Sequence, residues 1–162
     1  MKIGLVSDTH DNMPMIKKAV DCFNDRKVDL VLHAGDIISP FCASEFSRLK
    51  SRFIAVFGNN DGEKRIWREK IKSLGEIHDG SYSCELGGVQ FLLMHEPWQL
   101  EALALSRKLD IIIYGHTHKV HNHIIGGTLV LNPGECCGWL SGKSTIAVLE
   151  VPQKNVEIIS LN

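Results

Sequence analysis

The chain alternates short runs of apolar residues with polar clusters, and the runs have the length of β-strands. Residues 3–6, 29–32, 53–57 and 111–114 are apolar almost throughout. Runs without polar alternation are typical of strands that are covered on both faces of a sheet. After the first run, apolar residues recur at helical spacing from Met15 to Phe23. A strand, a helix and a second strand in this order predict a parallel βαβ unit and therefore an α/β fold.

Further elements follow from turn residues. Glycine pairs at 87–88 and 126–127 each separate two strand-like runs and predict two-residue hairpins. Pro97 is expected in the first turn of a helix over the apolar residues that follow it. The other predicted elements are helices at 43–49 and 63–74, the latter on the surface, hairpin strands at 82–86, 89–94, 120–125 and 128–131, and a closing antiparallel pair at 144–151 and 156–161. No linker or repeat interrupts them, so we expect a single domain over residues 1–162.

Polar clusters follow the buried runs. Asp8 and His10 are separated by one residue, so their side chains leave the same side of an extended chain. The clusters are Ser7-Asp8-Thr9-His10, Gly35-Asp36, Gly58-Asn59-Asn60-Asp61, a lone His95, and Gly115-His116-Thr117-His118. Because α/β sheets place ligands at the carboxyl ends of strands, these side chains are expected on one rim. Carboxylates and imidazoles gathered in this way are typical of a metal site.

Each cluster alone also has an ordinary structural interpretation. Asp8 can cap the following helix, and the glycine-flanked segment 58–62 can be a simple turn. His33 is expected to be a hydrogen-bonded core histidine or a support for Asp36 rather than a direct ligand. The order of the clusters at successive strand ends favours the metal site.

Composition narrows the class of protein. The 162 residues are 44% hydrophobic, enough to bury a sizeable core, and a formal net charge of −1 gives no reason to expect a polyanion or an anionic membrane as partner. Five cysteines without a C-x-x-C pair argue against a disulfide framework and a zinc ribbon. No apolar run approaches the roughly 20 residues of a membrane span. These features predict a soluble, cytoplasmic protein.

The ordered set Asp-x-His, Gly-Asp, Gly-Asn-x-Asp, a histidine after a strand and Gly-His-x-His resembles the calcineurin-like metallophosphoesterase superfamily. It is most similar to the small YfcE-type and archaeal phosphodiesterase group, to which the retromer subunit Vps29 is related. The resemblance extends along the chain to the stretch Asn132-Pro133-Gly134-Glu135. It implies the metallo-dependent phosphatase fold, a four-layer α/β/β/α sandwich of two mixed β-sheets flanked by helices, with a two-metal site at one edge.

The resemblance also implies a ligand set. One metal would be held by Asp8, His10 and His118, and the other by Asn59, His95 and His116, with the Asp36 carboxylate bridging the two. Catalytic roles are expected for Asp36, Asn59 and Asn60. Two divalent ions per chain can share a hydroxide nucleophile and grip the phosphoryl oxygens. Ligands of nitrogen and oxygen suit Mn first, with Ni, Fe, Zn or Mg as alternatives.

The implied function is a metal-dependent phosphodiesterase acting on a small phosphate ester. A phosphomonoesterase with the same site stays an alternative, and so does a Vps29-like scaffold, whose branch typically loses a ligand histidine that is present here. No membrane partner is expected, and the absence of a basic groove-forming stretch disfavours nucleic acid. Relatives are often dimers or larger, which leaves a homo-oligomer open.

Two departures from the family pattern affect the chemistry. Many relatives carry histidine where this chain has Asn60, and an amide cannot give up a proton near neutral pH, so weak general-acid assistance is expected. Near His95, Glu96 would repel highly charged substrates, and Trp98 would either stack on a base or aryl group or pack on the core. His121 and His123 are expected either to contact the substrate or to face solvent. Cys136 and Cys137 are expected to have a structural role or to lie at an interface.

Overall fold

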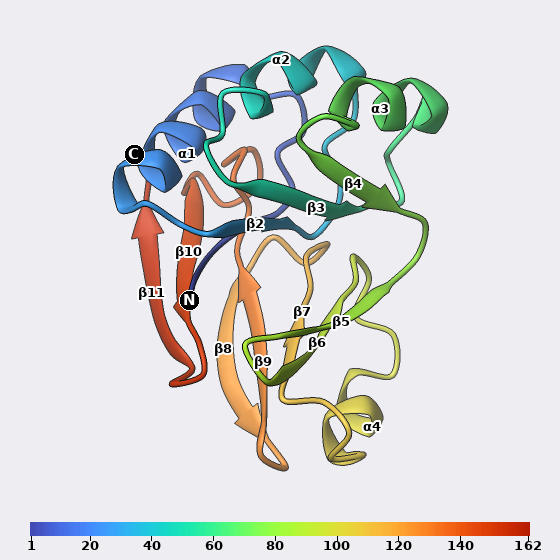
Figure 1. Cartoon of the computed structure of the whole chain (residues 1–162), viewed down its shortest axis with the longest axis vertical. Coiled ribbons are helices and arrows are strands. Elements are labelled where there is room, and N and C mark those ends of the chain that lie inside the picture. Colours follow the sequence, from blue (N-terminus) through green and yellow to red (C-terminus); the bar gives the residue numbers. More distant parts are fainter.

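Two mixed β-sheets lie face to face in the computed structural model, which describes all residues from 1 to 162 (Figure 1). The first sheet has the strand order β11-β10-β1-β2-β3-β4. Its strands are β1 (Lys2–Val6), β2 (Leu30–His33), β3 (Arg52–Val56), β4 (Gly75–His78), β10 (Thr145–Glu150) and β11 (Asn155–Ser160). Strands β1 to β4 are parallel, and β10 joins β1 antiparallel. The carboxyl ends of β1, β2 and β3 therefore meet at one rim.

The second sheet has the order β5-β6-β7-β9-β8. Its strands are β5 (Tyr82–Leu86), β6 (Val89–Leu93), β7 (Ile111–Ile113), β8 (Val120–Ile125) and β9 (Thr128–Pro133). The predicted hairpins are the antiparallel pairs β5–β6 and β8–β9, whereas β6, β7 and β9 run parallel. This arrangement directs the ends of β6 and β7 toward the rim of the first sheet.

Helices cover the outer faces of the two sheets. Helix α1 (Met13–Arg26), the short α2 (Ala43–Phe46) with its preceding 3-10 turn (Pro40–Cys42), and α3 (Lys64–Ile71) lie over the first sheet, and α4 (Leu100–Leu105) lies against the second (Figure 1). One hydrophobic cluster lies under the first three helices, one between the sheets, and a small one under α4. The expected four-layer order of helix, sheet, sheet and helix is confirmed.

The packing of strand β1 on both of its faces explains why its sequence has no polar face. Ile3 and Leu5 belong to the cluster between the sheets, whereas Val6 belongs to the cluster under the helices. Gly4 brings the strand close to α1, since a methyl group at this position would lie 2.6 Å from the ring of Phe23. Both faces of the strand are thus packed, which fixes the position of the polar residues that follow it.

Three details of the predicted elements are wrong. Strand β4 was not expected, because this short edge strand contains a glycine and is held by pairing with β3 rather than by its own pattern. Helix α4 begins at Leu100, after Gln99 in a left-handed conformation, so Pro97 lies before its first turn. Helices α2 and α3 are shorter than predicted, and α3 buries Trp67 completely.

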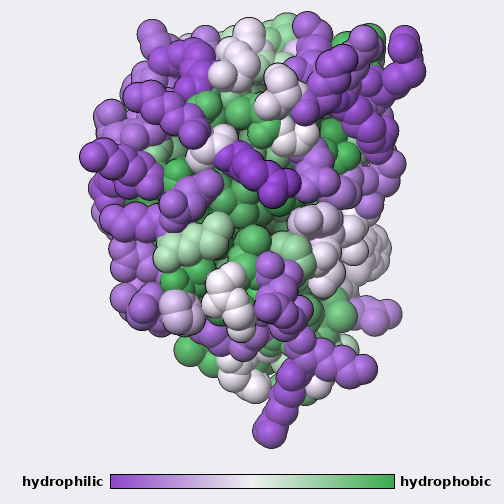
Figure 2. Space-filling view, in the orientation of Figure 1, coloured by the Kyte–Doolittle hydropathy of each residue, from purple (hydrophilic) through white to green (hydrophobic).

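Length and apolar character decide whether a helix of the protein can cross a membrane. None of the helices combines the length and the apolar character that crossing a membrane needs. On the face seen in Figure 2, hydrophilic side chains cover most of the area, and apolar side chains show between them mainly across the middle.

Candidate metal centre

The structure brings the seven predicted ligands together where the ends of five strands meet. Asp8 and His10 follow β1, Asp36 follows β2, Asn59 follows β3, His95 follows β6, and His116 and His118 follow β7. Ligand atoms of Asp8, Asp36 and His95 lie within 4.8 Å of one another. The strand-end rule thus holds for residues that lie more than one hundred positions apart in the sequence.

Asp36 lies between two halves of this centre. Its Oδ2 atom is 3.6 Å from His10 Nε2 on one side and 3.4 Å from His95 Nε2 on the other. The backbone and side-chain nitrogens of Asn60 donate to its two carboxylate oxygens at 2.9 and 2.7 Å. A carboxylate in this position offers one oxygen that both halves can share.

The first half contains Asp8, His10 and His118. Asp8 Oδ1 lies 3.4 Å from His118 Nε2 and 3.9 Å from His10 Nε2, and the two imidazole rings are 5.1 Å apart. His10 Nε2 is buried and has no hydrogen-bond partner. A buried nitrogen that has no hydrogen-bond partner and lies beside two carboxylates is suited to bind a cation.

The second half contains Asn59, His95 and His116. The Asn59 amide oxygen lies 2.9 Å from His95 Nε2 and 3.0 Å from His116 Nδ1. His95 Nδ1 donates to the carbonyl oxygen of Ala34 at 2.7 Å, which directs Nε2 toward the centre. This arrangement of a ring nitrogen fixed by a backbone carbonyl is the usual support of a metal-binding histidine.

Electrostatics distinguish the two buried carboxylates. Burial raises the pKa of Asp8, although Ser7 and nearby histidines oppose the shift. Burial also disfavours the ionised form of Asp36, but hydrogen bonds from His95 and Asn60 hold its pKa well below the ordinary value. The pKa of His95 is raised by Asp36 in spite of burial. Two acids in one buried place need positive charge, which a divalent cation can supply.

The loops that carry the ligands have an uncommon backbone. Five of the seven predicted ligands have positive φ angles: Asp8 at 51°, His10 at 39°, Asp36 at 57°, His116 at 65° and His118 at 59°. Non-glycine residues rarely adopt this conformation, and its clustering is typical of functional sites. Glycines allow the close approach of the loops, since a methyl group at Gly115 would overlap Ser7 Oγ and one at Gly58 the Asp36 carboxylate.

Glu135 supports the first half of the centre and was missed as a functional residue. Its carboxylate accepts hydrogen bonds from His118 Nδ1 at 2.8 Å, from the Cys137 thiol at 3.1 Å and from the backbone nitrogen of Leu140 at 3.1 Å. Burial opposes its ionisation, but hydrogen bonds led by Ser141 lower its pKa to about 2. The signal was an acid that closes the Asn-Pro-Gly turn. A carboxylate behind a histidine holds the ring and makes it a better ligand.

Asp61 joins the loops after β2 and β3. Its carboxylate accepts from the backbone nitrogens of Asp36 at 3.0 Å, Ile37 and Ile38 at 2.8 and 2.7 Å, and Gly58 at 2.7 Å. The Gly-Asn-x-Asp cluster therefore serves two purposes. Asn59 faces the centre, and Asp61 fixes the backbone that presents Asp36.

Other sequence interpretations are resolved by the contacts. His33 is a core histidine, as expected, because it accepts from Gly35 N at 3.1 Å and pairs with Thr9 Oγ1 at 3.2 Å. Burial lowers its pKa to about 3. The alternative prediction that Trp98 packs on the core is wrong, since this residue is 71% exposed. His121 pairs with the hydroxyl of Tyr114, and its partner on the strand, His123, is exposed.

A cavity of about 600 Å³ opens beside the second half of the centre. Asn59, His95 and Glu96 are among the residues that line it. The walls are formed by Phe57, Gly58, Lys64, Gly80, Ser81, Leu92, Met94, Trp98, Gln99 and Leu103. The cavity therefore joins the polar centre to a partly apolar space large enough for an organic group.

Comparison with known proteins agrees with this architecture. The profile of the calcineurin-like phosphoesterase superfamily domain matches residues 1–154. Phosphodiesterase MJ0936 of Methanocaldococcus jannaschii is 43% identical over 165 residues, covering 99% of each chain. The solved structure of an archaeal phosphodiesterase has a TM-score of 0.94 at 41% identity and covers 99% of both chains. Vps29 of Entamoeba histolytica, solved with zinc, shares the fold at a TM-score of 0.71 and 22% identity over both full chains.

Replacing Glu135 with Gln is expected to weaken divalent-metal binding by about 10- to 100-fold, because the amide no longer offers two acceptor oxygens behind His118. Calorimetric titration of Mn²⁺ into chelator-stripped protein measures the change, with circular dichroism to verify folding. Glu157→Gln, which removes only an exposed ion pair with Arg26, is the control. Equal affinity in both variants would mean that Glu135 does not orient the ligand.

Proposed function

The chain belongs to the calcineurin-like phosphoesterase superfamily, and from this membership we propose that it is a phosphodiesterase that depends on two divalent metal ions. The observation that carries the proposal is the Asp36 carboxylate, whose Oδ2 atom lies 3.6 Å from His10 Nε2 and 3.4 Å from His95 Nε2. A group shared between two sets of ligands is what a binuclear centre needs, and a single-metal site has no use for it.

The residues fit such a pair of ions. Asp8, His10 and His118 would hold one ion, Asn59, His95 and His116 the other, and Asp36 would belong to both. The ions would supply Lewis-acid charge to the phosphoryl oxygens and lower the pKa of a shared water so that it becomes the nucleophile. We keep Mn as the first choice of metal and Ni, Fe, Zn and Mg as alternatives.

Asn60 determines how the leaving group departs. Its side-chain nitrogen donates to Asp36 Oδ2 at 2.7 Å, so the amide holds the shared carboxylate. An amide cannot transfer a proton to a leaving oxygen near neutral pH. Leaving groups that are stable as anions, such as aryloxides, should therefore depart much faster than simple alkoxides.

Charge near the cavity favours a diester over a monoester. Glu96 lines the cavity next to His95 in the sequence, and Lys64, which also lines the cavity, is already paired with Asp79 at 3.1 Å. A phosphomonoester carries a charge of about −1.5 to −2 at neutral pH, whereas a diester carries a single negative charge. Glu96 repels the monoester more strongly. The apolar wall that includes Met94 and Trp98 would receive the ester group of the substrate.

The central prediction concerns metal dependence. Chelator-stripped protein should be inactive toward an aryl phosphodiester, regain activity with Mn²⁺ or Ni²⁺, and lose it in Asp36→Ala, because the carboxylate shared by both halves is gone. Asp21→Ala, which removes only an exposed ion pair with Arg48, is the control. The matching monoester is assayed in parallel.

A clear preference for the monoester would identify a phosphatase instead. Inactivity on both substrates in protein with measured bound metal would identify the non-catalytic scaffold. Either result contradicts the proposal.

Asn60→His is expected to raise the rate for diesters with poorly activated alkyl leaving groups by up to about 100-fold, because imidazole can donate the proton that the amide cannot. Asn60 is exposed, so the larger ring has room. Steady-state kinetics with a series of leaving groups test this, and Asn60→Gln is the matched amide control. A dependence on leaving-group pKa that stays unchanged in Asn60→His would rule out this role.

Trp98→Ala is expected to lower kcat/KM for a diester with two aryl groups about tenfold, because stacking on one aromatic side chain contributes about 1–3 kcal/mol. A methyl aryl diester should lose less, since its small group makes little contact with the cavity wall. Leu105→Ala, an exposed apolar residue of α4 outside the cavity, is the control. Equal losses on both diesters would contradict the assignment of the cavity to the ester group.

A further inference from the structure

We propose that the thiol of Cys137 is an additional ligand of the ion held by Asp8, His10 and His118, and that it biases this position toward a thiophilic ion such as Zn²⁺. The inference depends on the proposed function in one respect, namely that a metal binds in this half of the centre. It goes beyond the ligand set expected from the sequence, in which all ligand atoms are nitrogen or oxygen. The sequence predicted only a structural or interface role for Cys137.

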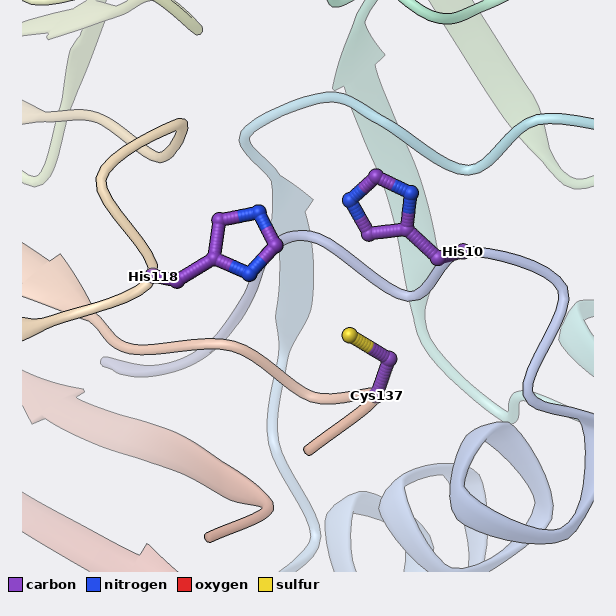
Figure 3. Close-up of side chains that lie close together, drawn as sticks. All are labelled: His10, His118 and Cys137. Carbon is purple, nitrogen blue, oxygen red and sulfur yellow. The ribbon is translucent and has the colours of Figure 1, made fainter. Parts of the chain in front are cut away.

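The thiol lies among the ligands of this half. Figure 3 shows His10 and His118 on opposite sides of a space that the sulfur of Cys137 approaches from below. The sulfur and one nitrogen of each imidazole lie within 4.8 Å of one another. Sulfur and nitrogen atoms that share one tetrahedral zinc ion are about 3.6 Å apart, since the bonds are about 2.3 and 2.1 Å long. The three side chains therefore need to approach one another by about 1 Å at most for shared coordination.

The backbone fixes Cys137 against the loop that carries two of the ligands. Its nitrogen donates to the carbonyl oxygen of Asp8 at 3.0 Å, and its carbonyl oxygen accepts from Asn12 Nδ2 at 2.8 Å. Trp139 Nε1 donates to the carbonyl oxygen of His10 at 3.3 Å. These contacts hold the thiol beside the centre, so its position is built into the fold.

One carboxylate holds both the thiol and a predicted ligand. Glu135 Oε2 accepts from Cys137 Sγ at 3.1 Å and from His118 Nδ1 at 2.8 Å. His10 Nε2, on the other side, is buried and has no hydrogen-bond partner. The neighbouring Cys136 is different, because it packs into the apolar cluster under the helices. Of the two adjacent cysteines, one fills the core and the other faces polar groups at the centre.

A thiolate makes the two metal positions chemically unequal. Thiolate ligands favour zinc over manganese, whereas the ligands Asn59, His95 and His116 offer only oxygen and nitrogen. On metal binding the Cys137 thiol loses its proton to solvent, and the Sγ–metal bond replaces the contact with Glu135. The structure is therefore suited to a mixed pair, with the softer ion beside Cys137.

Cobalt titration of chelator-stripped protein tests the proposal. Co²⁺ gives visible d–d bands on binding, and a thiolate ligand adds a sulfur-to-cobalt charge-transfer band in the near ultraviolet. We expect both in the unchanged protein, and we expect Cys137→Ser to lose the charge-transfer band while keeping the d–d bands. Cys84→Ser, in the half-buried strand β5 of the other sheet, should keep both. In competition experiments, Cys137→Ser should lose more affinity for Zn²⁺ than for Mn²⁺.

The outcomes separate this inference from the proposed function. Absence of d–d bands in the unchanged protein would show that it does not bind the metal and would contradict the proposed phosphodiesterase function. Visible bands without a charge-transfer band, or a charge-transfer band that persists in Cys137→Ser, would overturn the role of Cys137 alone. If Cys137→Ser does not fold, ¹¹³Cd NMR of the unchanged protein decides, because a thiolate ligand moves the cadmium resonance strongly downfield and its absence there overturns the proposal.

Discussion

The burial of two carboxylates in one place is the constraint on which the centre depends. Asp8 and Asp36 are 0% and 1% exposed, and both lie with His95 within a 4.8 Å cluster. Ionised groups without water are costly unless donors or cations surround them. Asn60 supplies two hydrogen bonds to Asp36, and the backbone nitrogen of His116 supplies a contact to Asp8. The remaining compensation comes from histidines and, in our proposal, from divalent ions.

Strained loops deliver these carboxylates, and two further acids hold the loops. Left-handed backbone at five of the predicted ligands costs of the order of 1–3 kcal/mol each where the conformation is sparsely populated. Such loops persist only if the surroundings fix them. Asp61 accepts four backbone hydrogens from the loops after β2 and β3, and Glu135 holds His118 together with the segment around Leu140. Packed strands supply the rigid base on which this strain is tolerated.

Much of this organisation could be predicted from the sequence, but the supporting contacts could not. Uniform apolar runs gave β1, β2, β3 and β7, and glycine pairs gave both hairpins, because local pattern decides these elements. Strand β4 depends on pairing with β3, which no local pattern encodes. The candidate residues came from the order of weak motifs at strand ends, and their assignment as ligands came from the family resemblance. The proximity of Cys137 to His10 could not be predicted, because His10 lies 127 positions earlier in the chain and only the folded backbone brings the two residues together.

The two halves of the centre differ in burial, and this difference suggests how a substrate is handled. Asp8 is buried, and the side chains of His10 and His118 are 20% and 14% exposed, so the first half is the more enclosed one. Asn59 and His116 are exposed, and the cavity opens beside Asn59. In the proposed function, a phosphate ester would therefore approach from the second half with its organic group in the cavity. In our proposals, the more enclosed half would hold its ion without limiting access, and a sulfur ligand there would not obstruct the substrate as it would on the open side.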